Sequence, residues 1–118
     1  MNDQMSQIIQ KGNMLCSSIS TGPSHVWVGL RLARQPRGNV VISANPPIGD
    51  CTHQKLDGTK IRQAVERGVS LANFECSSSW HLVEIVYVDD DAPRYDLYEV
   101  LGHRIVRALE SGEVTEVE

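Results

Sequence analysis

The fold is decided by TKIRQAVERGVSLAN (residues 59–73), WHLVEIVYVD (80–89) and DAPRYDLYEVLGHRIVRALESG (91–112). The first and third segments place apolar residues three or four positions apart, which is typical of an amphipathic helix. The middle segment is apolar on nearly both faces and is predicted to be a central strand of a sheet. Helix, strand and helix follow one another here with almost no linker.

The first helix is predicted to run from about Gly58 to Asn73, with Asp57 or Thr59 as its N-terminal cap. Its buried stripe is predicted from helical spacing and comprises Ile61, Ala64, Val65, Val69 and Ala72.

The last helix is predicted to begin near Asp91 and Pro93 and to end at Ser111 and Gly112, since glycine suits a C-terminal cap. Its predicted inward residues are Leu97, Val100, Leu101, Ile105, Ala108 and Leu109.

Three strands are predicted upstream, over residues 14–20, 25–34 and 39–44. In the second, Val26, Val28, Leu30 and Leu32 alternate onto one face. The turn Gln35–Gly38 predicts that the second and third strands form an antiparallel hairpin. The fold class is therefore α+β, a two-layer β-β-β-α-β-α sandwich with helices on one side of the sheet. Residues 1–118 are expected to form a single domain, with 1–13 as a polar arm and 113–118 as an acidic tail.

This element order resembles the ribosomal protein S5 domain 2-like fold. Within it, Gly22–Val26, Ile61–Val69 and His81–Asp91 resemble stretches of domain IV of elongation factor G. The resemblance implies a translation-related role with RNA or the ribosome as partner. The loops that would reach the ribosome read Thr21–Ser24 and Asp90–Pro93, and they lack the family's histidine. No phosphate-binding loop motif occurs in the sequence.

Composition narrows the function classes. Eleven Lys and Arg against 15 Asp and Glu give a formal charge of −4, which argues against a dedicated nucleic-acid binder. Cys16, Cys51 and Cys76 are odd in number and widely spaced, so no disulfide framework is predicted. No segment resembles a signal peptide or a membrane span, and a cytoplasmic location without membrane contact is expected.

Two polar clusters are candidates for chemistry. Asp89–Asp91 offers carboxylates for a divalent cation, or simply caps the last helix. Cys51 and His53, after Asp50, could supply a nucleophile and base or two zinc ligands, or belong to a surface loop. Because nothing completes either set, we predict a non-enzymatic protein with no cofactor and no metal. A small enzyme using either cluster is the alternative.

Two basic groups are candidates for nucleic acid or phosphate. Arg31, Arg34 and Arg37 flank the predicted hairpin near Trp27, and arginine beside an aromatic ring is typical of single-strand binding sites. The second group is either a phosphate-binding face or a solvated helix surface. It comprises Arg94, His103, Arg104 and Arg107, with Glu99 as the predicted partner of His103.

The sheet face away from the helices is predicted to be apolar. Glu84 is best kept out of the core, which places the even-numbered residues of the fourth strand on the open face. The predicted interface residues are Trp27, Val41, Trp80, Leu82, Val86 and Val88. Such a patch requires a cover. A second copy or another partner is the favoured cover, which predicts a binding module, and a homodimer is expected. The alternative is the arm around Met5, Ile8 and Ile9.

Overall fold

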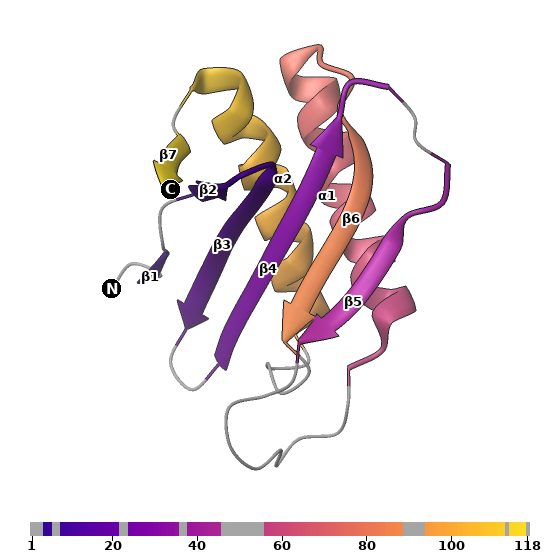
Figure 1. The fold of residues 1–118 in the computed structure, drawn as a ribbon. Helices are drawn as coiled ribbons and strands as arrows, with labels where there is room; N and C mark the ends of the chain where they lie inside the picture. The colour runs from indigo at the N-terminus through magenta and orange to yellow at the C-terminus, as the bar shows by residue number, and fades with distance from the viewer. Residues whose placement is uncertain are drawn as a thin grey trace.

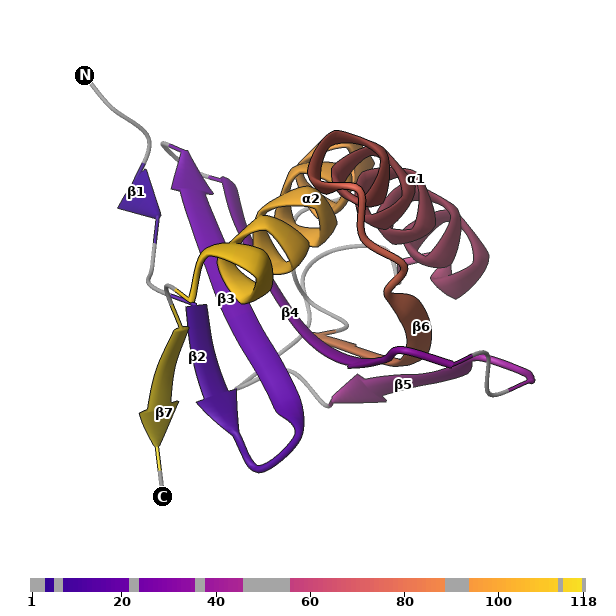
Figure 2. The ribbon, with the colours of Figure 1, turned by 90° about the horizontal axis from the view of Figure 1, so that it is seen from above.

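The computed structural model describes residues 4–5, 8–21, 24–35, 38–45, 56–88, 94–112 and 114–117. Its two helices are α1 (Gly58–Cys76) and α2 (Tyr95–Ser111), and both cover the same face of one sheet (Figures 1 and 2). The predicted α+β class, with helices on one side of the sheet, is therefore confirmed.

Within the described ranges the sheet has seven strands in the order β5-β6-β4-β3-β2-β7, with β1 pairing to β3. The strands are β1 (Gln4–Met5), β2 (Ile8–Lys11), β3 (Met14–Thr21), β4 (Ser24–Ala33), β5 (Val41–Asn45), β6 (His81–Val88) and β7 (Val114–Val117).

The predicted hairpin between the second and third predicted strands, now β4 and β5, is wrong. β6 lies between them, antiparallel to β4 and parallel to β5. The central position predicted for β6 is confirmed. The unit β5-α1-β6 is consequently a parallel crossover. In Figure 1 both strands point downwards, the helices lie behind the sheet, and β6 lies to the left of β5, so the crossover is left-handed. About 98% of such connections have the opposite hand.

The chain ends extend the sheet where an arm and a tail were predicted. β2 pairs antiparallel with β3 and parallel with β7, so the described parts of residues 1–13 and 113–118 include strands. Ile8 is buried in the core and Val114 packs against it. β1 and β2 therefore lie at one side of the sheet and do not cross its open face (Figure 1).

The core lies between the sheet and the helices. The predicted stripe of α1 is confirmed, since Ile61, Ala64, Val65, Val69 and Ala72 are all buried. Asp57 caps α1 by accepting a hydrogen bond from the Thr59 backbone N–H at 2.9 Å. α2 ends at Gly112 with φ 79°, as its predicted cap requires. Val100 was predicted to face inwards and is instead exposed.

The two helices approach closely at Gly68. A Cβ atom placed on Gly68 would lie 2.1 Å from the Glu99 carbonyl oxygen of α2. On the outer side of this contact, Arg67 pairs with Glu99 at 2.8 Å and His103 with Glu75 at 2.6 Å. The predicted pair between Glu99 and His103 is replaced by these two pairs between helices. Neither helix in the described part of the chain is long and apolar enough to cross a membrane.

Candidate interaction site on the open sheet face

Strand alternation determines which side chains point away from the helices. Val26, Val28 and Leu30 are fully buried beneath the helices. The residues that alternate with them on β4, Trp27 and Gly29, therefore lie on the open face.

The same alternation on the neighbouring strands completes this face. On β6, Val86 and Val88 alternate with the buried Ile85 and Tyr87. On β5, Val41 stands beside Glu84 in the register and is 55% exposed. The structure thus places Trp27, Val41, Val86 and Val88 on the predicted face.

A hollow of about 460 Å³ lies on this face. Five of its six lining side chains are apolar or weakly polar, and the sixth is a lysine. They are Ile9, Lys11, Met14, Cys16, Trp27 and Val86. We call this feature the open-face hollow.

Gly29 gives the hollow its shape. Register pairs connect Ile9 to Cys16, Cys16 to Gly29 and Gly29 to Val86, so these four residues form one row across β2, β3, β4 and β6. A Cβ atom on Gly29 would lie 3.0 Å from Met14 Sδ and 3.2 Å from Trp27 Cη2. The missing side chain therefore lets the Trp27 ring and the Met14 thioether lie over the centre of the row, and these two side chains line the hollow.

Some charged side chains around the hollow form an ion pair and one does not. Arg31 pairs with Glu84 across the strands at 2.9 Å, so these charges offset each other. Lys11 has no carboxylate within ion-pair distance among the residues that the structure describes. Burial raises the pKa of the Cys16 thiol, and the nearby Lys11 ammonium partly opposes that rise. The electrostatic effect of Lys11 thus reaches the inside of the hollow.

The prediction that Trp80 and Leu82 lie on the open face is wrong. The register between β4 and β6 shifts between Arg31 and Leu32, because β6 carries an extra residue there. Such a bulge turns the residues beyond it to the other face. Trp80 and Leu82 consequently pack against the core on the helix side.

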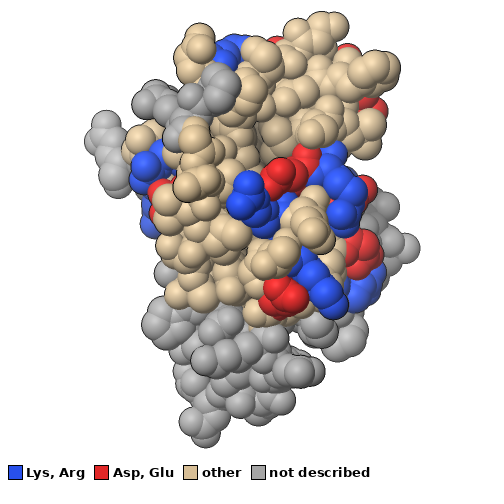
Figure 3. Space-filling view, turned by 90° about the vertical axis from the view of Figure 1, so that its right-hand side faces the viewer, with Lys and Arg blue, Asp and Glu red and all other residues tan. Residues whose placement is uncertain are grey.

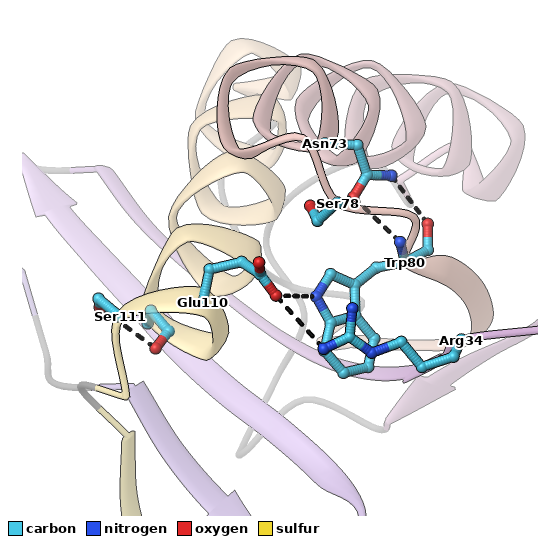
Figure 4. Close-up of polar contacts among 7 residues, drawn as sticks. Arg34, Asn73, Ser78, Trp80, Glu110 and Ser111 are labelled. Atoms are coloured by element: carbon cyan, nitrogen blue, oxygen red, sulfur yellow. Dashed lines mark hydrogen bonds and ion pairs between the residues drawn. The ribbon is translucent and has the colours of Figure 1, made fainter.

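On that side Trp80 is held by polar contacts (Figure 4). Its indole N–H donates to Glu110 Oε2 at 3.0 Å, and the Arg34 guanidinium stacks on its ring at 4.0 Å. Asn73 fixes the turn that leads into β6, since its side chain donates to the Trp80 carbonyl at 2.9 Å and accepts from the Trp80 N–H at 3.0 Å. Trp80 is therefore a structural residue of the α1–β6 connection.

The predicted nucleic-acid arginines do not form one surface. Arg31 lies on the open face, where it pairs with Glu84. Arg34 lies on the helix side, where its guanidinium stacks on Trp80 and is 3.5 Å from the carboxylate of Glu110. Arg37 lies outside the described residues.

Of the four basic candidates at α2, Arg94, His103 and Arg107 are paired, whereas Arg104 is exposed and has no ion pair among the described residues. Arg107 and His103 share the carboxylate of Glu75, and Arg94 pairs with Asp96 at 2.8 Å. On the side of the molecule formed by α1 and β5, Lys and Arg lie next to Asp and Glu instead of gathering by themselves (Figure 3). This charge pattern is typical of a solvated helix surface.

Two clusters were considered for chemistry. Both lie outside the described residues, namely residues 50–53, which include Cys51 and His53, and residues 89–91, which are three aspartates. Within the ranges that the structure describes, no group of three or more His, Cys, Asp or Glu side chains could hold a metal ion.

Sequence reasoning missed four residues of the open-face hollow, namely Ile9, Lys11, Met14 and Cys16. Ile9 was assigned to an arm, although its position in β2 beside β3 makes it part of the face. Met14 and Cys16 alternate with Leu15 and Ser17, and this alternation could have assigned them to the face.

Fold and site together define a two-layer α+β protein in which both described helices lie on the same face of the sheet. Comparisons with models of protein families, with curated proteins and with solved structures found no match.

Proposed function

We propose that this protein is a non-enzymatic binding module that self-associates through its open sheet face. The observation that carries the proposal is the open-face hollow, with Trp27 at its margin and no described helix over it. Exposed apolar area of this kind marks interaction surfaces, and tryptophan is enriched among the residues that dominate binding energy.

Self-association has a simple geometry here. Two sheets can pack face to face about 10 Å apart, with their inner side chains interdigitating. Each Å² of apolar surface removed from water contributes about 25 cal/mol before the costs of association. Trp27, Val86 and Val88 would supply the centre of such an interface, and the pair of Arg31 and Glu84 would lie toward its edge.

The test is the molar mass of the full chain, measured by size-exclusion chromatography with light scattering. We expect a dimer for the unaltered chain and a folded monomer for Trp27→Glu, because a buried carboxylate without a partner opposes association. Trp80→Phe is the matched control and should stay dimeric, as should Cys51→Ser and His53→Ala. A monomer at every concentration of the unaltered chain would contradict self-association.

The biological partner beyond a second copy is proposed from the resemblance to domain IV of elongation factor G and to the ribosomal protein S5 domain 2-like fold. That resemblance supports a translation-related partner in the cytoplasm, RNA or protein. The charge of −4 and the ion pairing of Arg31 and Arg34 favour a protein surface over RNA. Co-sedimentation with ribosomes tests it, and absence from the ribosomal pellet at low salt would contradict it.

A further inference from the structure

We infer that the open-face hollow binds a free straight-chain amphiphile with a carboxylate head, its chain against the apolar lining of the hollow and its head beside Lys11. The inference rests on the proposed function in one respect, since it takes the open face as the interaction surface. It adds a class of small ligand that the proposed function does not include.

The shape of the hollow favours a linear chain. The row Ile9, Cys16, Gly29 and Val86 crosses four adjacent strands, and three strand spacings of about 4.8 Å give a length of about 14 Å. Trp27 and Met14 lie over Gly29, so a bound chain would contact these two side chains instead of the glycine. The volume of about 460 Å³ falls in the range of small-molecule sites, roughly 300 to 1,000 Å³.

The lining of the hollow favours an apolar chain. Ile9, Met14, Trp27 and Val86 present hydrocarbon, thioether and aromatic surface, and the Cys16 thiol behaves as a small hydrophobic group. A polar ligand would leave its hydrogen-bonding groups unpaired against these side chains, which is costly.

The charge around the hollow favours an anionic head. Lys11 stands opposite Met14 in the register and two residues from Ile9 on the same strand, so its ammonium lies at the β2 end of the row. Glu84 is already paired with Arg31, whereas Lys11 has no carboxylate partner in the described ranges. A carboxylate at this end would supply one, and an ammonium head would be repelled.

The experiment uses fluorescence of the full chain carrying Trp80→Phe. The sequence has two tryptophans, so Trp27 alone then reports on the hollow. The probes share one chain length and differ in the head group: decanoate, decanol and decyltrimethylammonium, each below its micelle concentration. We expect a saturable change with decanoate, weaker binding of decanol and the weakest binding of the cation.

Matched lysine variants isolate the head-group contact. Lys11→Gln should weaken the binding of decanoate about fivefold, which is the upper end for the loss of an exposed ion pair. The affinity for decanol should not change. Lys11→Arg should retain decanoate binding, which separates loss of charge from disturbance of β2. Lys60→Gln, on α1 and away from the open face, should have no effect. Equal binding of the three probes, or equal effects of Lys11→Gln and Lys60→Gln, would overturn the inference.

Light scattering in the presence of decanoate separates this inference from the proposed function. Two copies packed through the open face would cover the hollow, so decanoate should dissociate the dimer. A dimer that shows no saturable fluorescence change with decanoate would contradict the proposed ligand and would support self-association. A chain that is already a monomer without decanoate and binds decanoate with the Lys11 dependence would overturn self-association and support the ligand.

Discussion

The absence of a side chain at Gly29 shapes the open face as much as any side chain there. Any larger residue would push against Met14 and Trp27, whose atoms lie 3.0 and 3.2 Å from the position of its Cβ. Glycine normally weakens a strand interior, and it is found where another group approaches the backbone closely. At position 29 the approaching groups are two neighbouring side chains.

Glu75, on α1, links the two helices through His103 and Arg107 on α2. Its carboxyl group makes the stability of the folded chain depend on pH. The hydrogen bond from His103 is the main cause of the lowered pKa of Glu75, and Arg107 lowers that pKa further. A carboxyl whose pKa is lowered by folding stabilises the folded chain above its unfolded value, about 4.5 here. That contribution is lost as pH falls through the lower folded pKa.

We therefore expect Glu75→Gln to lower the unfolding temperature at neutral pH and to approach the unaltered chain below about pH 3, where carboxyl groups are protonated. Thermal unfolding followed by circular dichroism across this pH range measures the difference. A difference that stays constant with pH would show that the carboxylate charge of Glu75 does not contribute.

At the scale of elements, the crossing of α1 and α2 depends on two glycines. A Cβ on Gly68 would overlap the Glu99 carbonyl, and one on Gly102 would lie 2.8 Å from the Val65 carbonyl. Backbone atoms cannot swing aside as side chains do, so the helices would have to separate.

We expect Gly68→Ala to lower the free energy of unfolding by about 3 kcal/mol, the upper end for overpacking, and Gly102→Ala by less. Urea denaturation measures both. Ser70→Ala, exposed on the same helix, should change stability by no more than about 0.5 kcal/mol. Equal stabilities of Gly68→Ala and Ser70→Ala would rule out the close approach.

The two helices could be predicted because their signals are local. The apolar spacing of α1, its cap at Asp57 and the terminal Gly112 of α2 all act within a few residues. Strand pairing depends on residues far apart in the sequence. The turn at Gln35–Gly38 gives no sign that β6, some forty residues later, lies between β4 and β5.

Prediction of the open face from the sequence is limited in the same way, and here the limit concerns single residues. Trp27, Val86 and Val88 follow strict alternation and were placed on the predicted face. Trp80 and Leu82 belong to the same strand segment, yet the register shift at Arg31 and Leu32 turns them inwards. Sequence alternation does not reveal a bulge, because a single inserted residue exchanges the two faces beyond it.

For the whole molecule, net charge makes the salt dependence of self-association informative. Each chain carries a formal charge of −4, so two copies repel each other at long range. Salt screens that repulsion, with a Debye length of about 10 Å at 0.1 M, and leaves the apolar contact of the open faces largely unaffected. Binding to nucleic acid behaves in the opposite way, because salt removes the advantage of releasing counterions.

We therefore expect the dimer dissociation constant to stay level or fall as salt rises from about 0.05 to 0.5 M. A dilution series followed by light scattering at each salt concentration measures it, with Trp27→Glu as the monomeric reference throughout. A dimer that dissociates as salt rises would indicate an interface held by ion pairs. Its contacts would then lie among charged side chains outside the open-face hollow, because Lys11 is the one charged side chain that lines it.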